Sequence, residues 1–275
     1  MTPAQALQQA AAAGVARLDA QLLLLHALGR PATDRAWLVA HDDEAIAADA
    51  AQAFQGFLVR RAAGEPLAYL VGYKEFFGLD LQVDARVLVP RPDTETLVEW
   101  ALEVLTGRAA PRVVDLGTGS GAIALAIACR RRDAEVEAVD ASAGALAVAT
   151  QNARRLDLPV HFVQARWLAQ ARGPYDLVVS NPPYVAAGDE HLQALRHEPR
   201  EALVAGADGL DDVREIVHQA PAVLASGGWL LLEHGWDQAA AVRGLLQAAG
   251  FADVGSRRDL AGIERCTGGR RLEQG

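Results

Sequence analysis

The sequence is poor in cysteine and in long apolar runs, and each shortage excludes a class of protein. Cys129 and Cys266 are the two cysteines of the 275-residue chain. They lie far apart and outside any Cys-x-x-Cys spacing, which argues against a disulfide framework. No apolar run approaches the roughly 20 residues that span a membrane, and the first residues lack the order of a secretion signal. We therefore expect a cytoplasmic protein with no membrane contact.

Positive charge and aromatic residues are also scarce. The formal net charge is −9, whereas proteins that bind nucleic-acid backbones broadly carry basic stripes. This acidity leaves room for a local basic patch, and it is common among ordinary soluble proteins. Aromatic residues make up 5% of the chain, but hydrophobic residues as a whole reach 51%. That content supports a real core in one large domain or two modest ones.

The first part of the chain has the pattern of a small helical bundle. Residues 1 to about 63 are rich in alanine and leucine and contain few β-branched residues, which favours helices. Glycines stand where three such helices should end, at Gly14, Gly29 and Gly64. We predict a helical domain over residues 1–71 and, from its turn glycines and alternating apolar residues, a β-hairpin linker over residues 72–92.

From residue 93 to residue 275, short apolar runs alternate with helical patterns. We interpret the runs VVDL, VEAVD, VHFVQ, YDLVV and WLLLE as buried strands and the tail as a closing pair of strands. The alternation predicts an α/β domain with a mostly parallel sheet covered by helices on both faces. Ligands of such sheets bind beyond the carboxyl ends of the strands. That edge is where we expect Gly117, Asp140, Arg166, Trp167 and Asn181.

A glycine-rich turn, DLGTGSGA, follows the first of these strands. Gly117, Gly119 and Gly121 permit a tight turn and let a ligand approach the backbone, because no Cβ stands in the way. The position between a strand and a helix predicts a nucleotide-containing ligand. The spacing also fits the G-x-G-x-x-A pattern of dinucleotide sites.

Two acidic residues bear on the identity of that ligand. Asp140 ends the next strand and suits ribose hydroxyls, which NAD and S-adenosylmethionine share, so it does not choose between them. It also stands where it would cap the following helix. Asp115 precedes the glycines, where a carboxylate suits a cationic sulfonium with an amino group better than a pyrophosphate. By itself this preference is modest.

The segment SNPPY, Ser180 to Tyr184, ends another strand. Two successive prolines do not belong in a helix interior and donate nothing to a sheet, so Asn181 and Tyr184 are held on a stiff, extended turn. The Asn oxygen and a proline carbonyl can each accept one N–H of a planar NH2 group, while the Tyr ring stacks on its plane. These bonds contribute about 1 kcal/mol each, whereas alignment of the nitrogen with a methyl sulfonium can contribute up to roughly 7–11 kcal/mol. The pattern predicts methyl transfer by positioning, without a strong base.

DLGTGSG, VEAVD and NPPY, in that order, resemble class I S-adenosylmethionine-dependent methyltransferases of the amino-methylating branch. The segments GYKEFFGLDLQVDARVLVPRPDTETLVEWAL, HEPREALVAGADGL and LLLEHGW make nearly the whole chain similar to the release factor glutamine methyltransferase (PrmC/HemK) family. NPPY alone is shared with adenine-N6 methyltransferases, whereas VPRPDTE together with NPPY is much more specific. The implied fold is a Rossmann-like class I methyltransferase domain, preceded by a small helical bundle and a linking β-hairpin.

The resemblance implies transfer of a methyl group from S-adenosylmethionine to the side-chain amide nitrogen (N5) of the glutamine in the Gly-Gly-Gln motif of peptide chain release factors. The N-terminal helices would dock the release factor. The implied contacts to the methyl donor come from Gly117, Thr118, Gly119, Ser120, Gly121, Asp140, Trp167 and Asn181. The implied catalytic residues are Asn181, Pro182 and Tyr184, and the glutamine amide would be held by Asn181, Pro182, Pro183 and Tyr184.

One position departs from the family pattern. The family usually has an acidic residue before the tryptophan, where this chain has Ala165-Arg166-Trp167. An acid there would accept a hydrogen bond from the adenine amino group, which arginine cannot do. Adenine recognition would then rest on backbone groups, or the donor would bind less tightly.

Two other functions stay open at this point. One is an adenine-N6 nucleic-acid methyltransferase, against which the net acidity and the lack of a basic recognition domain both count. The other is a non-catalytic nucleotide-binding protein, such as a methyltransferase relic disabled around Arg166. Glu190, His191 and His197 follow NPPY without a second cluster of ligands, so we expect no metal. We expect a monomer that binds release factors and makes no direct contact with nucleic acid.

Overall fold

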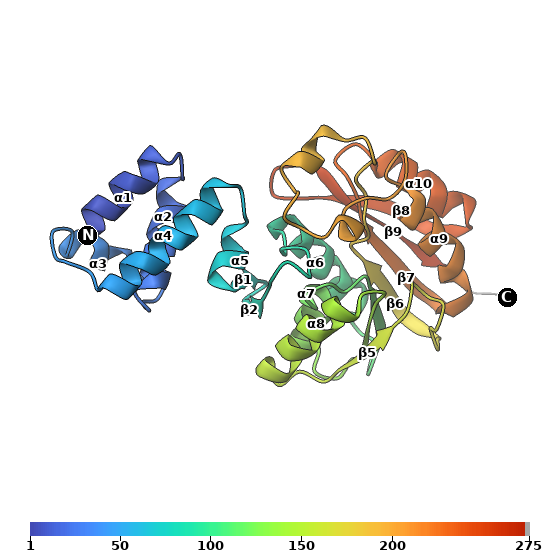
Figure 1. Cartoon of the computed structure of the whole chain (residues 1–275). Helices are drawn as coiled ribbons and strands as arrows, with labels where there is room; N and C mark the ends of the chain where they lie inside the picture. Colours follow the sequence, from blue (N-terminus) through green and yellow to red (C-terminus); the bar gives the residue numbers. More distant parts are fainter. Residues whose placement is uncertain (273–275) are drawn as a thin grey trace. The chain divides into compact units, whose positions relative to one another are not determined.

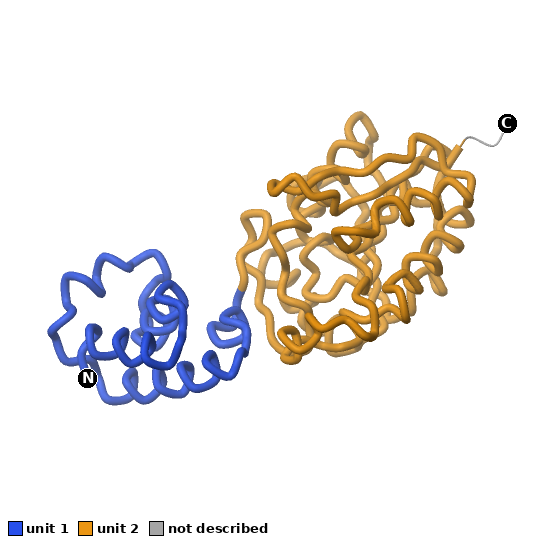
Figure 2. Tube along the Cα trace, turned by 90° about the horizontal axis from the view of Figure 1, so that it is seen from above, with its two compact units in different colours: residues 1–73 blue, residues 74–275 orange. Residues whose placement is uncertain are grey.

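The computed structural model describes residues 1–272, and the chain divides into two compact units, Met1–Tyr73 and Lys74–Gly275 (Figure 2). The last three residues of the predicted 93–275 domain lie outside the described residues. No helix in the described part of the chain combines the length and the apolar character that a membrane span requires.

The first unit is helical, as the alanine- and leucine-rich pattern predicted. Its helices are α1 (Pro3–Ala12), α2 (Arg17–Ala27), α3 (Arg35–Ala40), α4 (Ala48–Ala62) and α5 (Leu67–Val71). A capping box begins α1: Thr2 Oγ1 accepts from the Gln5 backbone N–H, and Gln5 Oε1 accepts from the Thr2 N–H. The helices bury a common core that includes Leu23, Leu24, Leu38, Phe54 and Leu58.

The predicted hairpin is confirmed and occupies the first half of the predicted segment. β1 (Tyr73–Phe76) and β2 (Leu79–Gln82) are joined by Phe77 and Gly78, both of which have positive φ. Two successive positive φ angles form the type I′ turn that suits the twist of a two-residue hairpin. The Phe77 N–H donates to Glu95 Oε1 over 3.0 Å, which ties the turn to the start of helix α6 (Glu95–Val104).

The second unit is built on a seven-stranded sheet with the order β5-β4-β3-β6-β7-β9-β8. The strands from β5 to β7 are parallel, and β9 and β8 close the sheet in antiparallel pairing. Their bounds are β3 (Arg112–Leu116), β4 (Glu135–Asp140), β5 (Val160–Gln164), β6 (Tyr175–Ser180), β7 (Leu224–Glu233), β8 (Phe251–Arg258) and β9 (Glu264–Arg271). This arrangement confirms the predicted α/β fold with a mostly parallel sheet.

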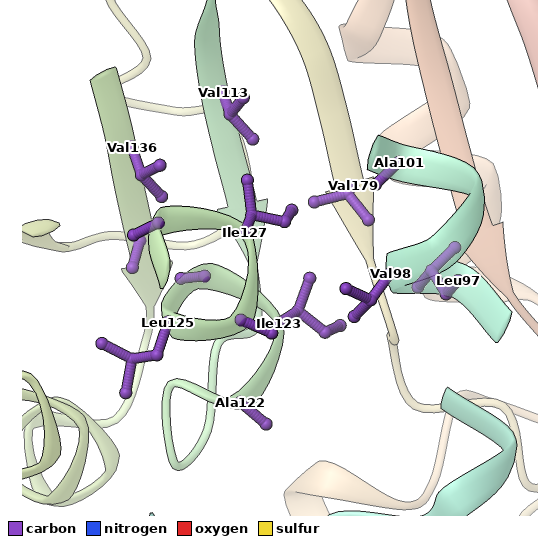
Figure 3. Close-up of a cluster of buried hydrophobic side chains, with 14 of the residues drawn as sticks. Leu97, Val98, Ala101, Val113, Ala122, Ile123, Leu125, Ile127, Val136 and Val179 are labelled. Atoms are coloured by element: carbon purple, nitrogen blue, oxygen red, sulfur yellow. The ribbon is translucent and has the colours of Figure 1, made fainter. Parts of the chain in front are cut away.

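Helices cover both faces of the sheet (Figure 1). Successive residues of a strand point to opposite faces, so Val113 packs with α6, α7 and α8, whereas Val114 packs with α9 and α10. Figure 3 shows Ile123 and Ile127 of α7 between the strands and α6. The helices are α7 (Ala122–Arg130), α8 (Ala143–Leu156), α9 (Asp211–Val223) and α10 (Ala239–Ala248). Short 3-10 turns lie at η1 (Pro92–Thr94), η2 (Glu190–Gln193) and η3 (Arg200–Ala202).

A buried amide joins the hairpin to the glycine-rich turn. Asn152 of α8 is fully buried, and its Oδ1 accepts from the Gln82 N–H over 2.7 Å. Its Nδ2 donates to the Gln82 and Ser120 carbonyls, each over 3.0 Å. The amide therefore satisfies three backbone groups in two segments that lie far apart in the sequence.

We predict that Asn152→Ala destabilises the protein by about 2–4 kcal/mol, because a buried backbone group left unpaired costs roughly 1–3 kcal/mol. Chemical denaturation of the full chain measures the change. Gln151→Ala on the exposed side of the same helix is the matched control and should change stability by about 0.5 kcal/mol or less. Equal effects of the two substitutions would contradict the assigned role of Asn152.

Candidate active site

The parallel register brings three strand ends to one row. Leu116 pairs with Val139 on one side and with Ser180 on the other. The next residue of each segment, Gly117, Asp140 and Asn181, therefore lies just beyond the same row. The chain leaves β3 for β4 on one side and later returns to β6 on the other, which makes this the topological switch point where ligands of such sheets bind.

A cavity opens at this edge of the sheet. Its lining comes from the loop after β2, the glycine-rich turn, the ends of β4, β5 and β6, and the loop before α9. Of the sequence-predicted site residues, six line it: Gly117, Gly119, Asp140, Trp167, Asn181 and Pro183. Thr118, Ser120, Gly121, Pro182 and Tyr184 are not among the lining residues.

The three glycines of the turn have different surroundings. All have positive φ, at 67° for Gly117, 55° for Gly119 and 85° for Gly121. A Cβ on Gly121 would stand 2.9 Å from Leu125, so this glycine permits close packing of α7. A Cβ on Gly119 would meet nothing nearer than a backbone oxygen at 4.0 Å. Gly119 therefore leaves open space on the cavity side, where a ligand can approach the backbone.

Asp115 supports the turn from below and does not line the cavity. It is fully buried, and its Oδ2 accepts from Thr118 Oγ1 over 2.6 Å and from the Ala124 N–H over 3.2 Å. Burial raises the pKa of this carboxyl to about 7, against the effect of these two hydrogen bonds. Asp115 Oδ1 has no hydrogen-bond partner among residues 1–272, and the interpretation of Asp115 as the partner of a bound sulfonium stays a prediction.

Asp140 faces the cavity from the end of β4. Its Oδ2 accepts from the Gly119 N–H over 2.9 Å, and its Oδ1 accepts from the Ser142 N–H over 2.8 Å. The cap of α8 is Ser142, whose side chain accepts from the Ala145 N–H, so helix capping does not account for Asp140. Burial raises the pKa of Asp140, and the two backbone hydrogen bonds act against that rise. Each carboxylate oxygen keeps a lone pair for a further donor.

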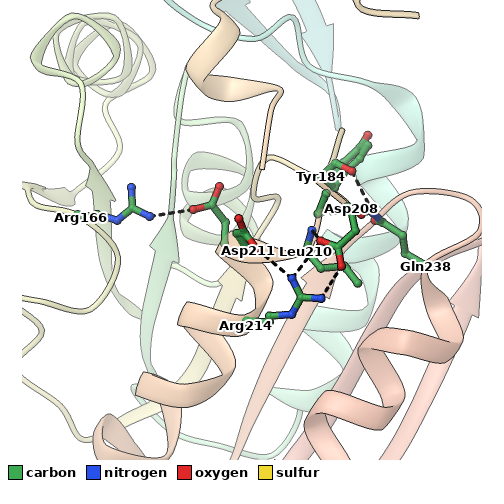
Figure 4. Close-up of polar contacts among 9 residues, drawn as sticks. Arg166, Tyr184, Asp208, Leu210, Asp211, Arg214 and Gln238 are labelled. Atoms are coloured by element: carbon green, nitrogen blue, oxygen red, sulfur yellow. Dashed lines mark hydrogen bonds and ion pairs between the residues drawn. The ribbon is translucent and has the colours of Figure 1, made fainter. Parts of the chain in front are cut away.

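Trp167 and Arg166 follow β5 at the cavity and differ in burial. Trp167 is buried in a left-handed backbone conformation, and its Nε1 has no hydrogen-bond partner within residues 1–272. The Arg166 side chain is 62% exposed and is held by two acids of α9, Asp212 at 3.1 Å and Glu215 at 2.7 Å. Figure 4 shows the Arg166 guanidinium reaching toward the start of α9.

Asp212 is a lining residue that sequence analysis missed. It is 8% exposed, and burial raises the pKa of its carboxyl while the charge of Arg166 opposes the rise. The sequence signal was weak, because an Asp pair at the start of a helix is ordinary. Arg86, Val87 and Leu88, in the irregular stretch after the hairpin, also line the cavity and were not predicted.

The NPPY turn is anchored at both ends. Ser180 Oγ donates to the Leu116 carbonyl over 2.7 Å, which fixes β6 against β3. Gln238 Nε2 donates to the Tyr184 carbonyl over 3.0 Å, as Figure 4 shows. Between them, Asn181 Nδ2 donates to Thr94 Oγ1 over 3.3 Å, while Asn181 Oδ1 is buried without a partner in the described residues. Burial raises the pKa of the Tyr184 phenol, which therefore stays neutral.

The loop after NPPY returns over the turn. Val185 and Val204 form a parallel bridge. Glu198 is buried, accepts from the Val89 N–H over 3.0 Å and pairs with Arg91, so it ties the loop to the segment before η1. Within residues 1–272, no group of three or more His, Cys, Asp or Glu side chains is placed to hold a metal ion.

The cavity fits a nucleoside ligand with a planar base. Asp140 can accept from ribose hydroxyls, Gly119 leaves room at the backbone, and Trp167 offers an aromatic surface. These are the groups that an adenosyl ligand such as S-adenosylmethionine requires. The roles of the individual residues toward such a ligand stay predictions.

Substitution of Arg166 tests why this chain has an arginine where the family usually has an acidic residue. We predict that Arg166→Asp lowers stability more than Arg166→Gln does, because the aspartate would stand beside Asp212 and Glu215. Loss of these exposed pairs alone should cost about 1 kcal/mol or less. Urea denaturation of both variants measures the difference, and an Arg166→Asp variant as stable as the wild type would contradict the description.

Comparison with known proteins assigns both parts of the chain. Residues 4–72 match the family model "PrmC N-terminal domain", and residues 94–235 match "Methyltransferase small domain". The release factor glutamine methyltransferase of Bordetella pertussis is 52% identical over 260 residues, with 93% of this chain and 95% of that protein covered. That of Burkholderia pseudomallei is 51% identical over 280 residues, covering 98% and 97%.

The fold recurs in solved structures. A T. thermophilus 16S rRNA N2 G1207 methyltransferase, in complex with AdoMet and guanosine, aligns with a TM-score of 0.54 over 72% of this chain and 49% of that chain, at 19% identity. At that identity the match shows a common fold alone. The sequence identity to the curated relatives, over almost the full length of both proteins, shows the family: the chain belongs to the release factor glutamine methyltransferases.

Proposed function

We propose that this protein methylates N5 of the glutamine in the Gly-Gly-Gln motif of peptide chain release factors, with S-adenosylmethionine as the methyl donor. The observation that carries the proposal is Asn181, which lines the same cavity as Asp140 and keeps a buried amide oxygen without a partner. An acceptor of this kind is what a primary amide substrate needs. The names of the curated relatives support the same substrate.

On this proposal, the sheet edge holds the donor by residues from three strands. Asp140 accepts from the ribose, the backbone at Gly117 and Gly119 borders the amino-acid part, and Trp167 contacts the adenine. The bound donor supplies an electrophilic methyl group on a sulfonium. Arg166 points its charge toward α9, and Asp212, which pairs with it, is an acid that lines the cavity near Trp167.

The NPPY turn would act on the substrate amide. Asn181 Oδ1 and the Pro182 carbonyl each accept one N–H, and the Tyr184 ring stacks on the amide plane. Acceptance of both protons favours a more tetrahedral nitrogen and turns its lone pair toward the methyl carbon. With a donor bound, the methyl carbon would pass from the sulfonium to this nitrogen and leave a neutral thioether, and the methylated amide, a strong acid, would release one proton to water. Because the pKa of Tyr184 is raised by burial, the phenol does not serve as a base.

The proposed partner is a protein, in keeping with the acidity of the chain. A net charge of −9 disfavours broad contact with nucleic-acid backbones. We assign the docking of the release factor to the helical unit, with the protein acting as a monomer in the cytoplasm. An adenine base in nucleic acid also carries a planar NH2, so it is the alternative substrate that the experiment must exclude.

Labelled methyl transfer to an unmodified release factor tests the proposal. We expect label on the Gly-Gly-Gln glutamine, located by mass spectrometry, and none on an adenine-containing duplex offered in the same reaction. Asn181→Ala should lower the rate at least about 100-fold, because the loss combines a hydrogen bond with misplacement of the nitrogen. Label on the duplex, or full activity in the variant, would overturn the proposal.

Donor binding is tested separately with S-adenosylhomocysteine by calorimetry. We predict that Asp140→Ala weakens binding by about 10- to 100-fold, since hydrogen bonds to a charged acceptor contribute roughly 1.5–3 kcal/mol. Asp80→Asn, on the exposed side of the hairpin, is the matched control and should leave the affinity unchanged. Unchanged affinity in Asp140→Ala would show that this carboxylate serves only the glycine-rich turn.

A further inference from the structure

A buried carboxylate lies beside the proposed catalytic amide and has no place in the reaction described so far. Glu233 ends β7, the strand next to β6, and Leu232 pairs with Ser180. Glu233 and Asn181 are therefore neighbours one step beyond that pair. Glu233 is 2% exposed, and its Oε2 has no hydrogen-bond partner among residues 1–272. A buried ionisable group without a full set of partners is costly and calls for an explanation.

The shape of the Asn181 amide does not determine which of its two end atoms faces Thr94, and Glu233 can determine it. The oxygen and nitrogen of a carboxamide are nearly equal in size, so only the surrounding donors and acceptors decide which way it faces. In the structure Nδ2 is turned to Thr94 Oγ1 at 3.3 Å, and Oδ1 is the atom left for a ligand. The Thr94 hydroxyl, however, can donate as well as accept, so by itself it does not fix the amide.

An ionised carboxylate can only accept hydrogen bonds. Beside Thr94 it therefore decides whether the hydroxyl donates to Asn181 or accepts from it. A hydroxyl that donates its single proton to Glu233 offers a lone pair, and not a proton, to Asn181. Thr94 is 4% exposed, so water does not compete for it. The Thr94 hydroxyl and the Asn181 side chain both lower the pKa of Glu233 by hydrogen bonding. Because Asn181 Nδ2 donates to Thr94 Oγ1 and the β6–β7 register places Glu233 beside Asn181, the three side chains can form one chain of hydrogen bonds that runs from amide to carboxylate.

We propose that Glu233 is a positioning residue: its ionised carboxylate fixes the direction of the hydrogen-bond chain through Thr94, and so holds Asn181 with Nδ2 inward and Oδ1 toward the substrate amide. This inference rests on the proposed function of Asn181. It assigns Glu233 no contact with the donor or the substrate. Protonation of Glu233 would reverse the chain, since a carboxylic acid donates to Thr94 and the hydroxyl can then donate to Asn181 Oδ1.

Protonation of Glu233, which would reverse the direction of the hydrogen-bond chain, falls in an accessible pH range. Burial raises the pKa of Glu233 to about 7, and the charge of Asp93 adds to this, while the Thr94 hydrogen bond and the charge of Arg265 act against it. Arg265 also pairs with Asp93 and with Asp259, so its charge is shared. Cys266, opposite Glu233 on β9, has its own pKa raised by burial and by Glu233, and it stays neutral.

The remaining ionisable groups around Glu233 also keep the same charge near neutral pH. Burial and the Glu233 charge raise the pKa of Tyr184 on the NPPY turn, so the phenol is neutral in this range. His234, the next residue along the chain, has its pKa lowered by burial and contacts Thr267 Oγ1. Glu233 is consequently the group of this cluster that changes charge near neutral pH. It is ionised above its pKa, so the productive orientation is lost as the pH falls through about 7.

The pH dependence of kcat, at saturating donor and release factor, tests the proposal. Between pH 8 and pH 6 the wild-type kcat should fall about tenfold, as the ionised fraction of a group with a pKa of about 7 does. In Glu233→Gln, which has no carboxyl at this position, the fall should be clearly smaller, and any remainder reports Asp115, whose pKa burial also raises to about 7. Glu137→Gln, the same change on β4 at a half-buried glutamate bonded to Tyr175, should follow the wild type. A fall in Glu233→Gln equal to that of the wild type would overturn the proposal.

Thr94 variants separate positioning from general damage. Thr94→Val removes the hydroxyl at almost constant volume and should lower kcat about tenfold or more, with the KM for the release factor changed less than about threefold. Thr94→Ser restores the hydroxyl and should recover kcat to within about threefold of the wild type. Equal loss in both variants would contradict a role for the hydroxyl.

A measurement without substrate keeps this inference distinct from the proposed function. In protein labelled with ¹⁵N-asparagine, the side-chain amide signal of Asn181, assigned by its absence in Asn181→Ala, should shift with a midpoint near pH 7 in the wild type. The shift should be absent in Glu233→Gln. An Asn181 signal that ignores pH in the wild type would overturn the positioning role, whereas failure to methylate any release factor would overturn only the proposed substrate.

Discussion

The parallel register of β3 with its two neighbours is the constraint on which the rest of the site depends. Since Leu116 pairs with both Val139 and Ser180, the glycine-rich turn, Asp140 and the NPPY turn begin at the same level of the sheet. A slip of one residue would turn every side chain of a strand to the other face. The two apolar layers that cover the sheet oppose this slip, because alternate residues of β3, such as Val113 and Val114, are buried in opposite layers.

At that edge the protein holds several buried polar atoms without partners, including Asn181 Oδ1, Trp167 Nε1 and Glu233 Oε2. A fold selected for stability alone would satisfy or remove such atoms, since each costs roughly 1–3 kcal/mol. Asn181 and Trp167 both line the cavity, where unpaired polar atoms are what a ligand-binding surface requires, and Glu233 lies beside Asn181 without lining the cavity. Asp115 Oδ1, below the glycine-rich turn, is a further atom of this kind, although the Oδ2 of the same carboxyl clamps the turn and burial raises its pKa to about 7.

The sequence was sufficient for the fold class and the hairpin, because strongly periodic segments and turn glycines report local structure directly. It was insufficient where the outcome depends on long-range contacts. Asp212 and Arg86 reach the cavity only through the folded arrangement. The role of Glu233 could not be read from LLLEHGW, since only the pairing of β7 with β6 places it beside Asn181. Motif residues with special chemistry were easier to find than the groups that orient them.

A crystal structure of the protein with S-adenosylhomocysteine and an unmodified release factor would test the central claim most directly. The account predicts the glutamine amide nitrogen within hydrogen-bonding distance of both Asn181 Oδ1 and the Pro182 carbonyl, with Asn181 Nδ2 still on Thr94. It also predicts the ribose hydroxyls on Asp140. A glutamine amide bound away from the NPPY turn, or an Asn181 amide turned with its nitrogen toward the substrate, would contradict it.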